Sequence, residues 1–366
     1  MRYRYSEWDE EFIRRLLAAR DLRRLFNYIL LQTNGDVDEA LRWLKYLQEQ
    51  RILPDDLDLD DFARKLREDR IIQKTTEGLS LTPKGEKQIR QESLERIFSS
   101  LKAEGRGNHP IPREGGGTTE PLPERRPYAF GDGTADIDFN LSFTNAMRRA
   151  QADQSEWSLS EQDLSVRETE STTSGATVLL LDVSHSMILY GEDRITPAKQ
   201  VAMAFAEMIL TRYPKDSLDV VAFGDDAVEI AVGDLPYVGA GPYHTNTQAG
   251  LRMARQILMR RRHHNKQIFM ITDGKPSVVR RANGMLYKNP VGLDPVIVNR
   301  TLDEAVICRK KRITITTFMV TSDPYLQRFV QRLTALNHGR AYFTPPDRLG
   351  GYIFWDFLNN RRKRLR

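Results

Sequence analysis

The stretch LLLDVSHSM places a carboxylate and two hydroxyls at alternate positions, Asp182, Ser184 and Ser186, at the end of an apolar run. An extended chain directs alternate side chains to the same side, so these three oxygens face one point. Asp273 follows the apolar run KQIFMIT, and Thr245 stands in HTNTQAGL ahead of a helical segment. Carboxylate and hydroxyl oxygens are hard ligands that suit six-coordinate Mg²⁺ or Mn²⁺. These five residues therefore predict a divalent-metal site.

Catalytic motifs that share parts of this pattern are missing from the sequence. A P-loop needs GxxxxGK[ST], which the sequence lacks, and GKPS at Gly274 has no upstream glycine at the required distance. A phosphatase of the haloacid dehalogenase type needs a second aspartate two residues after the first, and Ser184 occupies that place. The GxSxG motif of a nucleophile elbow is also absent. We therefore expect a binding protein and not an enzyme.

From Thr177 onward, apolar strand-like runs alternate with amphipathic helical segments. The runs are TVLLL, SLDVVAFG, AVEIAV, KQIFMIT, ITITTFMV and RAYF. Such alternation favours an α/β fold with a doubly wound, mostly parallel sheet of six strands. AVEIAV follows SLDVVAFG after only a turn, which predicts one antiparallel edge strand. In these sheets ligands bind beyond the carboxyl ends of the strands, where the five oxygen donors are expected.

Three motifs together resemble the metal-ion-dependent adhesion site of von Willebrand factor A (VWA) domains. They are Asp-x-Ser-x-Ser from Asp182, TNxxxGL from Thr245 and TDGKP at Asp273, and the resemblance covers about Thr177 to Tyr342. It implies that the two serines and Thr245 coordinate the ion, and that Asp182 and Asp273 bind it directly or through water. It also implies that a carboxylate from a partner protein fills the sixth position.

Two alternatives stay open at this end of the predicted sheet. Thr247 could replace Thr245 as the ligand, although the spacing of TN to GL favours Thr245. Asp225 and Asp226 follow SLDVVAFG, where they either form a turn or contact the ion through water.

A proline- and glycine-rich stretch over residues 105–133 predicts a linker. Before it, residues 1–104 favour a small helical domain whose order of helix, helix, strand, turn, strand and helix resembles a winged helix. A winged helix that reads DNA needs a basic face for the phosphates. Residues 1–100 carry 19 Lys plus Arg against 20 Asp plus Glu, which favours protein docking.

Three further segments are expected after the linker: a lead-in over residues 134–175 that packs on the next domain, the VWA domain over 176–346, and a C-terminal helix with a basic tail over 347–366. The last six residues, RRKRLR, hold five positive charges, which equals the formal net charge of +5. The single cysteine, Cys308, excludes an internal disulfide, and MRYRYSEWDEEF lacks the apolar centre of a signal peptide. We therefore expect a cytoplasmic protein without a membrane span.

These observations favour a Mg²⁺-dependent adaptor that captures an acidic residue of a partner protein. DVSHSMILYGEDRITPAK and KQIFMITDGKPS resemble intracellular bacterial VWA proteins associated with AAA+ ATPases of the MoxR and magnesium-chelatase type. This resemblance implies such an ATPase as the partner. The alternative is a DNA-associated regulator, in which residues 1–104 read DNA and the VWA domain senses a partner.

Overall fold

The computed structural model describes most of the chain and divides it into two compact units. One unit comprises Met1–Asn108 and Thr173–Leu358, and the other comprises His109–Thr172 and Asn359–Arg366. No helix in the described part is long and apolar enough to cross a membrane. The described residues are 22–54, 57–76, 78–103, 125–128, 137–153, 158–167, 174–191, 193–241, 243–273, 275–281, 283–289, 292–321 and 323–361, so most of the predicted linker and the end of the basic tail lie outside them.

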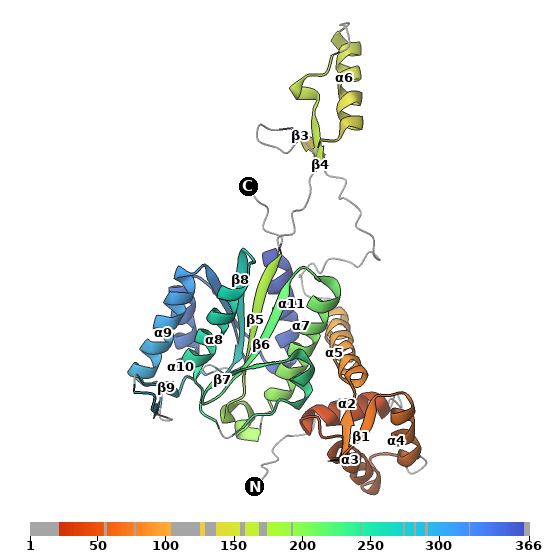
Figure 1. Cartoon of the computed structure of the whole chain (residues 1–366), viewed down its shortest axis with the longest axis vertical. Helices are drawn as coiled ribbons and strands as arrows, with labels where there is room; N and C mark the ends of the chain where they lie inside the picture. Colours follow the sequence, from red (N-terminus) through yellow and green to blue (C-terminus); the bar gives the residue numbers. More distant parts are fainter. Residues whose placement is uncertain are drawn as a thin grey trace. The chain divides into compact units, whose positions relative to one another are not determined.

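A six-stranded sheet forms the centre of the larger unit (Figure 1). Neighbouring strands pair in parallel except at one edge, where β6 and β7 are antiparallel. The predicted α/β fold, with a mostly parallel sheet and one antiparallel edge strand, is confirmed. In their spatial order the strands are β12 (Arg340–Phe343), β11 (Ile313–Met319), β8 (Asn265–Thr272), β5 (Gly175–Asp182), β6 (Ser217–Phe223) and β7 (Ala227–Ile230).

Helices cover both faces of this sheet and form two apolar cores. Leu179 and Leu181 of β5 belong to the core with α7 and α11, whereas Val178 and Leu180 belong to the core with α8, α9 and α10. Because both faces are buried, the central strands are continuously apolar. The helices span α7 (Ile195–Arg212), α8 (Thr247–Arg260), α9 (Pro295–Lys310), α10 (Pro324–Asn337) and α11 (Leu349–Arg361).

The order of the strands reverses at β5. The chain passes from β5 to β6 on one side, and β8 then pairs with the other side of β5. A crevice at such a reversal, beyond the carboxyl ends of the strands, is the usual ligand site of an open parallel sheet. Two short segments border this end: the 3₁₀ helix η3 (His185–Gly191) after β5, and a hairpin of β9 (Val278–Arg280) and β10 (Leu286–Lys288) after β8.

The N-terminal part of the larger unit is helical with one small sheet. Strands β1 and β2, which lie between α4 and α5 in the sequence, pair antiparallel. The order from α3 to α5 is the one that the sequence predicts, and α2 precedes it. The elements are α2 (Leu22–Gln32), α3 (Val37–Glu49), α4 (Leu59–Glu68), β1 (Ile72–Thr75), β2 (Gly78–Leu81) and α5 (Pro83–Ala103).

This N-terminal part docks on the sheet domain through α5, which packs along α7. The two parts share one apolar core, in which the rings of Phe98 and Phe354 lie 5.4 Å apart. The Arg90 Nε atom lies 3.3 Å from Oε2 of the buried Glu207 on α7. Most of α7 is therefore buried, by the sheet on one side and by α5 on the other.

The smaller unit is held together by its own contacts. It contains β3 (Arg125–Pro127), α6 (Phe139–Asp153), the 3₁₀ helix η2 (Glu161–Asp163) and β4 (Ser165–Arg167), with β3 and β4 antiparallel. Arg149 donates to both carboxylate oxygens of Asp163 at 3.0 Å. This interaction is the main reason why the pKa of Asp163 lies well below its usual range. The expected packing of the lead-in segment on the next domain stays a prediction.

Candidate metal centre

The five predicted ligands all lie at the carboxyl end of the parallel strands. Asp182 is the last residue of β5, and Ser184 and Ser186 follow it into η3. Asp273 directly follows β8, which is the neighbour of β5 in the sheet. Thr245 lies two residues ahead of the first residue of α8. The strand reversal therefore brings together segments as far apart in the sequence as Asp182 and Asp273.

Asp182 anchors this group from inside the protein. Its side chain is completely buried, and Ser184 N donates to Oδ1 at 3.0 Å. The hydroxyl of Thr272, the last residue of β8, donates to Oδ2 at 2.6 Å. Sequence reasoning missed Thr272, although a polar residue that ends an apolar strand next to Asp273 is a recognisable signal. The two bonds fix the carboxylate between neighbouring strands.

A chain of polar contacts continues from Asp182 to Asp273. The hydroxyl oxygens of Ser184 and Ser186 lie 3.0 Å apart, and Ser186 makes a side-chain hydrogen bond to Asp273. Lys275 N approaches Asp273 Oδ1 at 3.4 Å. Asp273 is 3% exposed and Ser184 is 1% exposed, so the side-chain oxygens of both residues are shielded from water. Four of the five predicted ligands thus form one connected cluster.

The electrostatics of this cluster are dominated by two buried carboxylates. Burial and, after it, the negative charge of Asp273 raise the pKa of Asp182 to about 7, although hydrogen bonds from Ser184 and Thr272 oppose the increase. Burial also raises the pKa of Asp273, although Arg194 and Lys275 partly oppose the increase. Two like charges at a buried site are costly unless a positive charge compensates them. A divalent cation at this position would provide that compensation.

Thr245 reaches the same end of the sheet from a loop. The loop lies along the Asp182 segment, because Gly241 N donates to Val183 O and His185 N donates to Tyr243 O, each at 3.0 Å. Thr245 itself is 2% exposed. Its backbone N donates to Ser277 Oγ at 2.9 Å, and its carbonyl accepts from Ser277 N at 2.9 Å. Ser277 was missed by sequence reasoning, even though it directly extends TDGKP.

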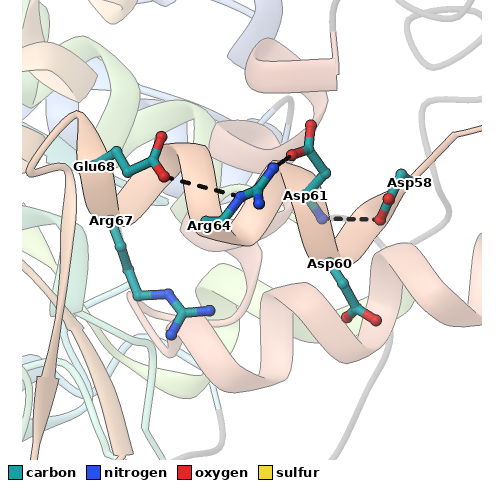
Figure 2. A pocket seen from close by; sticks show the side chains of 6 residues that line it. All are labelled: Asp58, Asp60, Asp61, Arg64, Arg67 and Glu68. Carbon is teal, nitrogen blue, oxygen red and sulfur yellow. Dashed lines mark hydrogen bonds and ion pairs between the residues drawn. The ribbon is translucent and has the colours of Figure 1, made fainter.

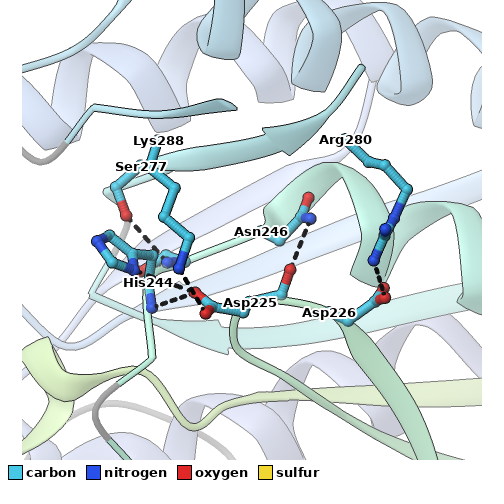
Figure 3. Close-up of polar contacts among 8 residues, drawn as sticks. Asp225, Asp226, His244, Asn246, Ser277, Arg280 and Lys288 are labelled. Atoms are coloured by element: carbon cyan, nitrogen blue, oxygen red, sulfur yellow. Dashed lines mark hydrogen bonds and ion pairs between the residues drawn. The ribbon is translucent and has the colours of Figure 1, made fainter. Parts of the chain in front are cut away.

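The alternative candidates also make contacts of their own in the structure, and their part in metal binding stays a prediction. Asp225 accepts hydrogen bonds from His244 N at 2.8 Å and from Lys288 Nζ at 2.8 Å, and Asp226 pairs with Arg280 (Figure 3). These contacts connect the turn after β6 to the hairpin β9–β10. Thr247 is the first residue of α8, directly after the N-cap residue Asn246, whose Oδ1 accepts from Ala249 N at 3.0 Å.

The donor set fits a hard divalent cation. Among the described residues, no group of three or more His, Cys, Asp or Glu side chains is arranged to hold a metal ion. A metal at this centre would therefore rely on hydroxyl oxygens together with the two carboxylates. All five side chains offer oxygen, the atom type that Mg²⁺ and Mn²⁺ prefer and that soft metals bind poorly.

The comparison with protein families agrees with this architecture. The family model described as "Rv0959-like protein, vWA domain" matches residues 175–358, which is half of the chain. The chain belongs to this family. The match begins with β5 and ends within α11, so it contains every residue of the candidate centre. A second model of the family, "Rv0959-like protein, third domain", matches residues 120–169, which fall within the smaller unit.

The curated relatives that the chain matches include uncharacterized proteins of mycobacteria. The uncharacterized protein Rv0959 of Mycobacterium tuberculosis (strain ATCC 25618 / H37Rv) is 28% identical over 336 residues, covering 84% of this chain and 49% of that protein. The uncharacterized protein Mb0984 of Mycobacterium bovis (strain ATCC BAA-935 / AF2122/97) gives the same values. The chain spans about half the length of the curated relatives it matches.

Solved structures with a related fold include parts of bacterial pili. The vWF domain of the type V pili tip protein Mfa5 from Porphyromonas gingivalis is 15% identical, covering 53% of this chain and 98% of that one with a TM-score of 0.41. The pilus adhesin SpaC from Lactobacillus rhamnosus GG, in its open conformation, is 18% identical, covering 52% and 30% with a TM-score of 0.39. Both TM-scores are below 0.5, so we infer no function from these likenesses.

Proposed function

We propose that this protein is a Mg²⁺-dependent adaptor whose VWA metal centre captures an acidic residue of a partner protein. The proposal is carried by the connected cluster of Asp182, Ser184, Ser186 and Asp273, with Thr245 on the adjoining loop. Two of these side chains are carboxylates and three are hydroxyls, which leaves one position of a six-coordinate ion for a ligand from outside. Mn²⁺ can take the place of Mg²⁺ in such a site.

The charge of the centre favours an acidic ligand. The two carboxylates balance the +2 charge of the ion, and Arg194 and Lys275 both lower the pKa of Asp273, which means that their positive charges act on the same group. A carboxylate from a partner would therefore approach an ion whose surroundings also include positive side chains. The hydroxyl ligands are neutral and do not repel such a carboxylate.

The proposed partner class is an AAA+ ATPase of the MoxR or magnesium-chelatase type. This part of the proposal rests on the resemblance of the two motif-bearing segments to VWA proteins associated with these ATPases. We propose no catalytic step for the chain itself, since the donor cluster includes neither a P-loop nor a nucleophile elbow. A cytoplasmic location is part of the same proposal.

DNA reading by the N-terminal part is less well supported. Along α4 lies an open depression lined by acidic and basic side chains (Figure 2). A surface with more carboxylates than guanidinium groups repels phosphates, which disfavours a nucleic-acid contact. The lining residues are Asp58, Asp60, Asp61, Arg64, Arg67 and Glu68.

Calorimetry with Mg²⁺ on the full chain tests the metal centre. We expect binding heat for the wild type, none for Asp182→Ala, and at least about tenfold weaker binding for Ser184→Ala. The matched control is Ser217→Ala, which removes a hydroxyl at the amino end of β6, far along the strand from the centre. Equal heats for the wild type and Asp182→Ala would contradict the proposal.

A pull-down with purified chain tests the partner. We expect an AAA+ ATPase to be retained in Mg²⁺ and released by EDTA, and to be absent with Asp182→Ala even in Mg²⁺. Mass spectrometry identifies the retained protein. Retention that is the same in Mg²⁺, in EDTA and with the variant would contradict metal-dependent capture.

A further inference from the structure

Thr245 differs from the other four proposed ligands in how it is placed. Asp182 and Asp273 sit at the ends of strands β5 and β8, whose positions are fixed by the sheet. Thr245 belongs to the loop ahead of α8 and lies in no strand. Metal ligands must be held close to their productive geometry, so the contacts that fix this loop decide whether Thr245 can serve.

Ser277 forms hydrogen bonds with both the backbone N–H and the carbonyl of Thr245. Thr245 N donates to Ser277 Oγ and Ser277 N donates to Thr245 O, each at 2.9 Å. The carbonyl of Ser277 in turn accepts from Asn289 N at 2.9 Å, just beyond β10. Ser277 is 6% exposed, so these bonds are protected from water. A single serine therefore connects Thr245 with both ends of the hairpin β9–β10.

Asp225 holds the residues on either side of Thr245. His244 N donates to Asp225 Oδ1 at 2.8 Å, and the His244 ring nitrogen Nδ1 lies 3.1 Å from the same oxygen. On the other side, Asn246 Nδ2 donates to the Asp225 carbonyl at 3.0 Å. Figure 3 shows these groups gathered beneath the hairpin. Thr245 is thus fixed from three directions: its own backbone, the preceding residue and the following residue.

The hairpin completes the arrangement through a salt bridge. Lys288 Nζ of β10 lies 2.8 Å from Asp225 Oδ2, so the carboxylate joins the hairpin with one oxygen and the Thr245 loop with the other. The neighbouring Asp226 also pairs with the hairpin, through Arg280, but its side chain accepts from Ala227 N and contacts neither His244 nor Asn246 in these bonds. The two adjacent aspartates therefore differ in one respect: Asp225 contacts the residues that flank Thr245.

We infer that Asp225 and Ser277 are positioning residues that hold Thr245 at the metal centre, and that the hairpin β9–β10 sets the metal affinity through them. This inference rests on the proposed metal site. In this inference neither residue is a ligand of the ion. Each acts through Thr245, which distinguishes it from a group that simply stabilises the fold.

The test is Mn²⁺ binding to the full chain, measured by electron paramagnetic resonance of free and bound ion. We expect Asp225→Asn and Ser277→Ala each to weaken Mn²⁺ affinity by about 10- to 100-fold, the usual effect of removing a group that orients a ligand. Asp226→Asn is the matched control, because it makes the same change of charge at the adjacent position. We expect its affinity to stay within about twofold of the wild type.

A double-substitution cycle separates positioning from general stabilisation. If both residues act through Thr245, their substitution has no further effect once the hydroxyl is gone. We therefore expect Thr245→Ala combined with Asp225→Asn, or with Ser277→Ala, to bind Mn²⁺ as Thr245→Ala alone does. Thermal unfolding of each variant verifies that it is folded, and the two independent positions keep the test decisive if one variant fails to fold.

The outcomes distinguish the inference from the proposed function. If the wild type binds no Mn²⁺, the proposed metal site fails and the inference fails with it. If the wild type binds and the two variants bind equally well, the site stands and the inference is overturned. Losses that add in the double variants also overturn it, because the residues would then act independently of Thr245.

Discussion

Two buried ionisable groups of this protein have surroundings that differ in one decisive way. Asp182 at the candidate metal centre and Lys199 on α7 are both completely buried, and their pKa values are shifted to about 7 from opposite directions, mainly by burial. Lys199 Nζ donates to Leu31 O at 2.7 Å and to Asn34 Oδ1 at 3.0 Å, both from the N-terminal part. Asp182 instead faces a second negative charge, that of Asp273.

The comparison separates a structural group from one that we propose to bind a ligand. The buried ammonium of Lys199 finds oxygen acceptors within the chain, so it contributes to the docking of α2 on α7 without an external partner. The two carboxylates of the candidate metal centre accept hydrogen bonds, but each of them also faces the negative charge of the other. A cation from outside would balance it, and for this reason the centre is the functional candidate.

The largest expected effect is a loss of stability when the contact between α7 and the N-terminal part is disrupted. Lys199→Ala removes a long buried side chain and two hydrogen bonds between α7 and the N-terminal part, so we expect about 3 kcal/mol less free energy of unfolding. Urea denaturation measures this loss, and Mg²⁺ affinity should be unchanged. Lys310→Ala at the exposed end of α9 is the control, with a change below about 0.5 kcal/mol. Equal stability of the two variants would contradict the structural role of Lys199.

The next effect concerns the metal. Mg²⁺ at a hundredfold excess over its Kd should raise the free energy of unfolding of the wild type by about 2.7 kcal/mol, because it binds the folded state alone. Asp182→Asn, which keeps the shape of the side chain and removes its charge, should gain nothing. Urea denaturation with and without EDTA measures both increments. The same increment in Asp182→Asn would mean that the ion binds elsewhere.

The smallest effect, taken per pH unit, is a pH dependence of the contact between Lys199 and the N-terminal part. Burial lowers the pKa of Lys199 from 10.5 to about 7, so between these values the unfolded chain binds a proton that the folded chain has released. Stability should therefore rise with pH above about 7, by at most about 1.4 kcal/mol per pH unit. The charge of Asp193 favours the protonated lysine and so opposes part of this lowering of the pKa.

Lys199→Met supplies the comparison for this pH dependence, because it keeps an apolar chain of similar length without a titratable group. We expect the difference in unfolding free energy between the wild type and this variant to change between pH 7 and pH 9. Urea denaturation at three pH values measures it. Parallel curves for the two proteins would show that Lys199 does not lose its proton in this range.

Much of the fold and of the candidate centre follows from local sequence patterns. The apolar runs predicted the strands because a strand buried on both faces needs continuous apolar residues. The spacing of Asp182, Ser184 and Ser186 predicted their convergence on the assumption of an extended chain. The chain instead turns into η3 from His185, so Ser186 meets Ser184 from a 3₁₀ helix and not from an extended strand. The hairpin β9–β10 escaped this reasoning, since each of its strands is three residues long and carries exposed polar positions.

The sequence by itself predicted the α/β architecture, the antiparallel edge strand and the set of candidate ligands, because each strand and each ligand motif is a short local pattern. The tertiary structure decided which distant segments meet. It placed Leu31 against Lys199 and Lys288 against Asp225. The burial of Lys199 and the support of Thr245 arise from these long-range contacts, which no local pattern encodes. LLLDVSHSM therefore contains the first residues of the proposed ligand set, and the hairpin contacts Asp225, which bonds to the residues next to Thr245.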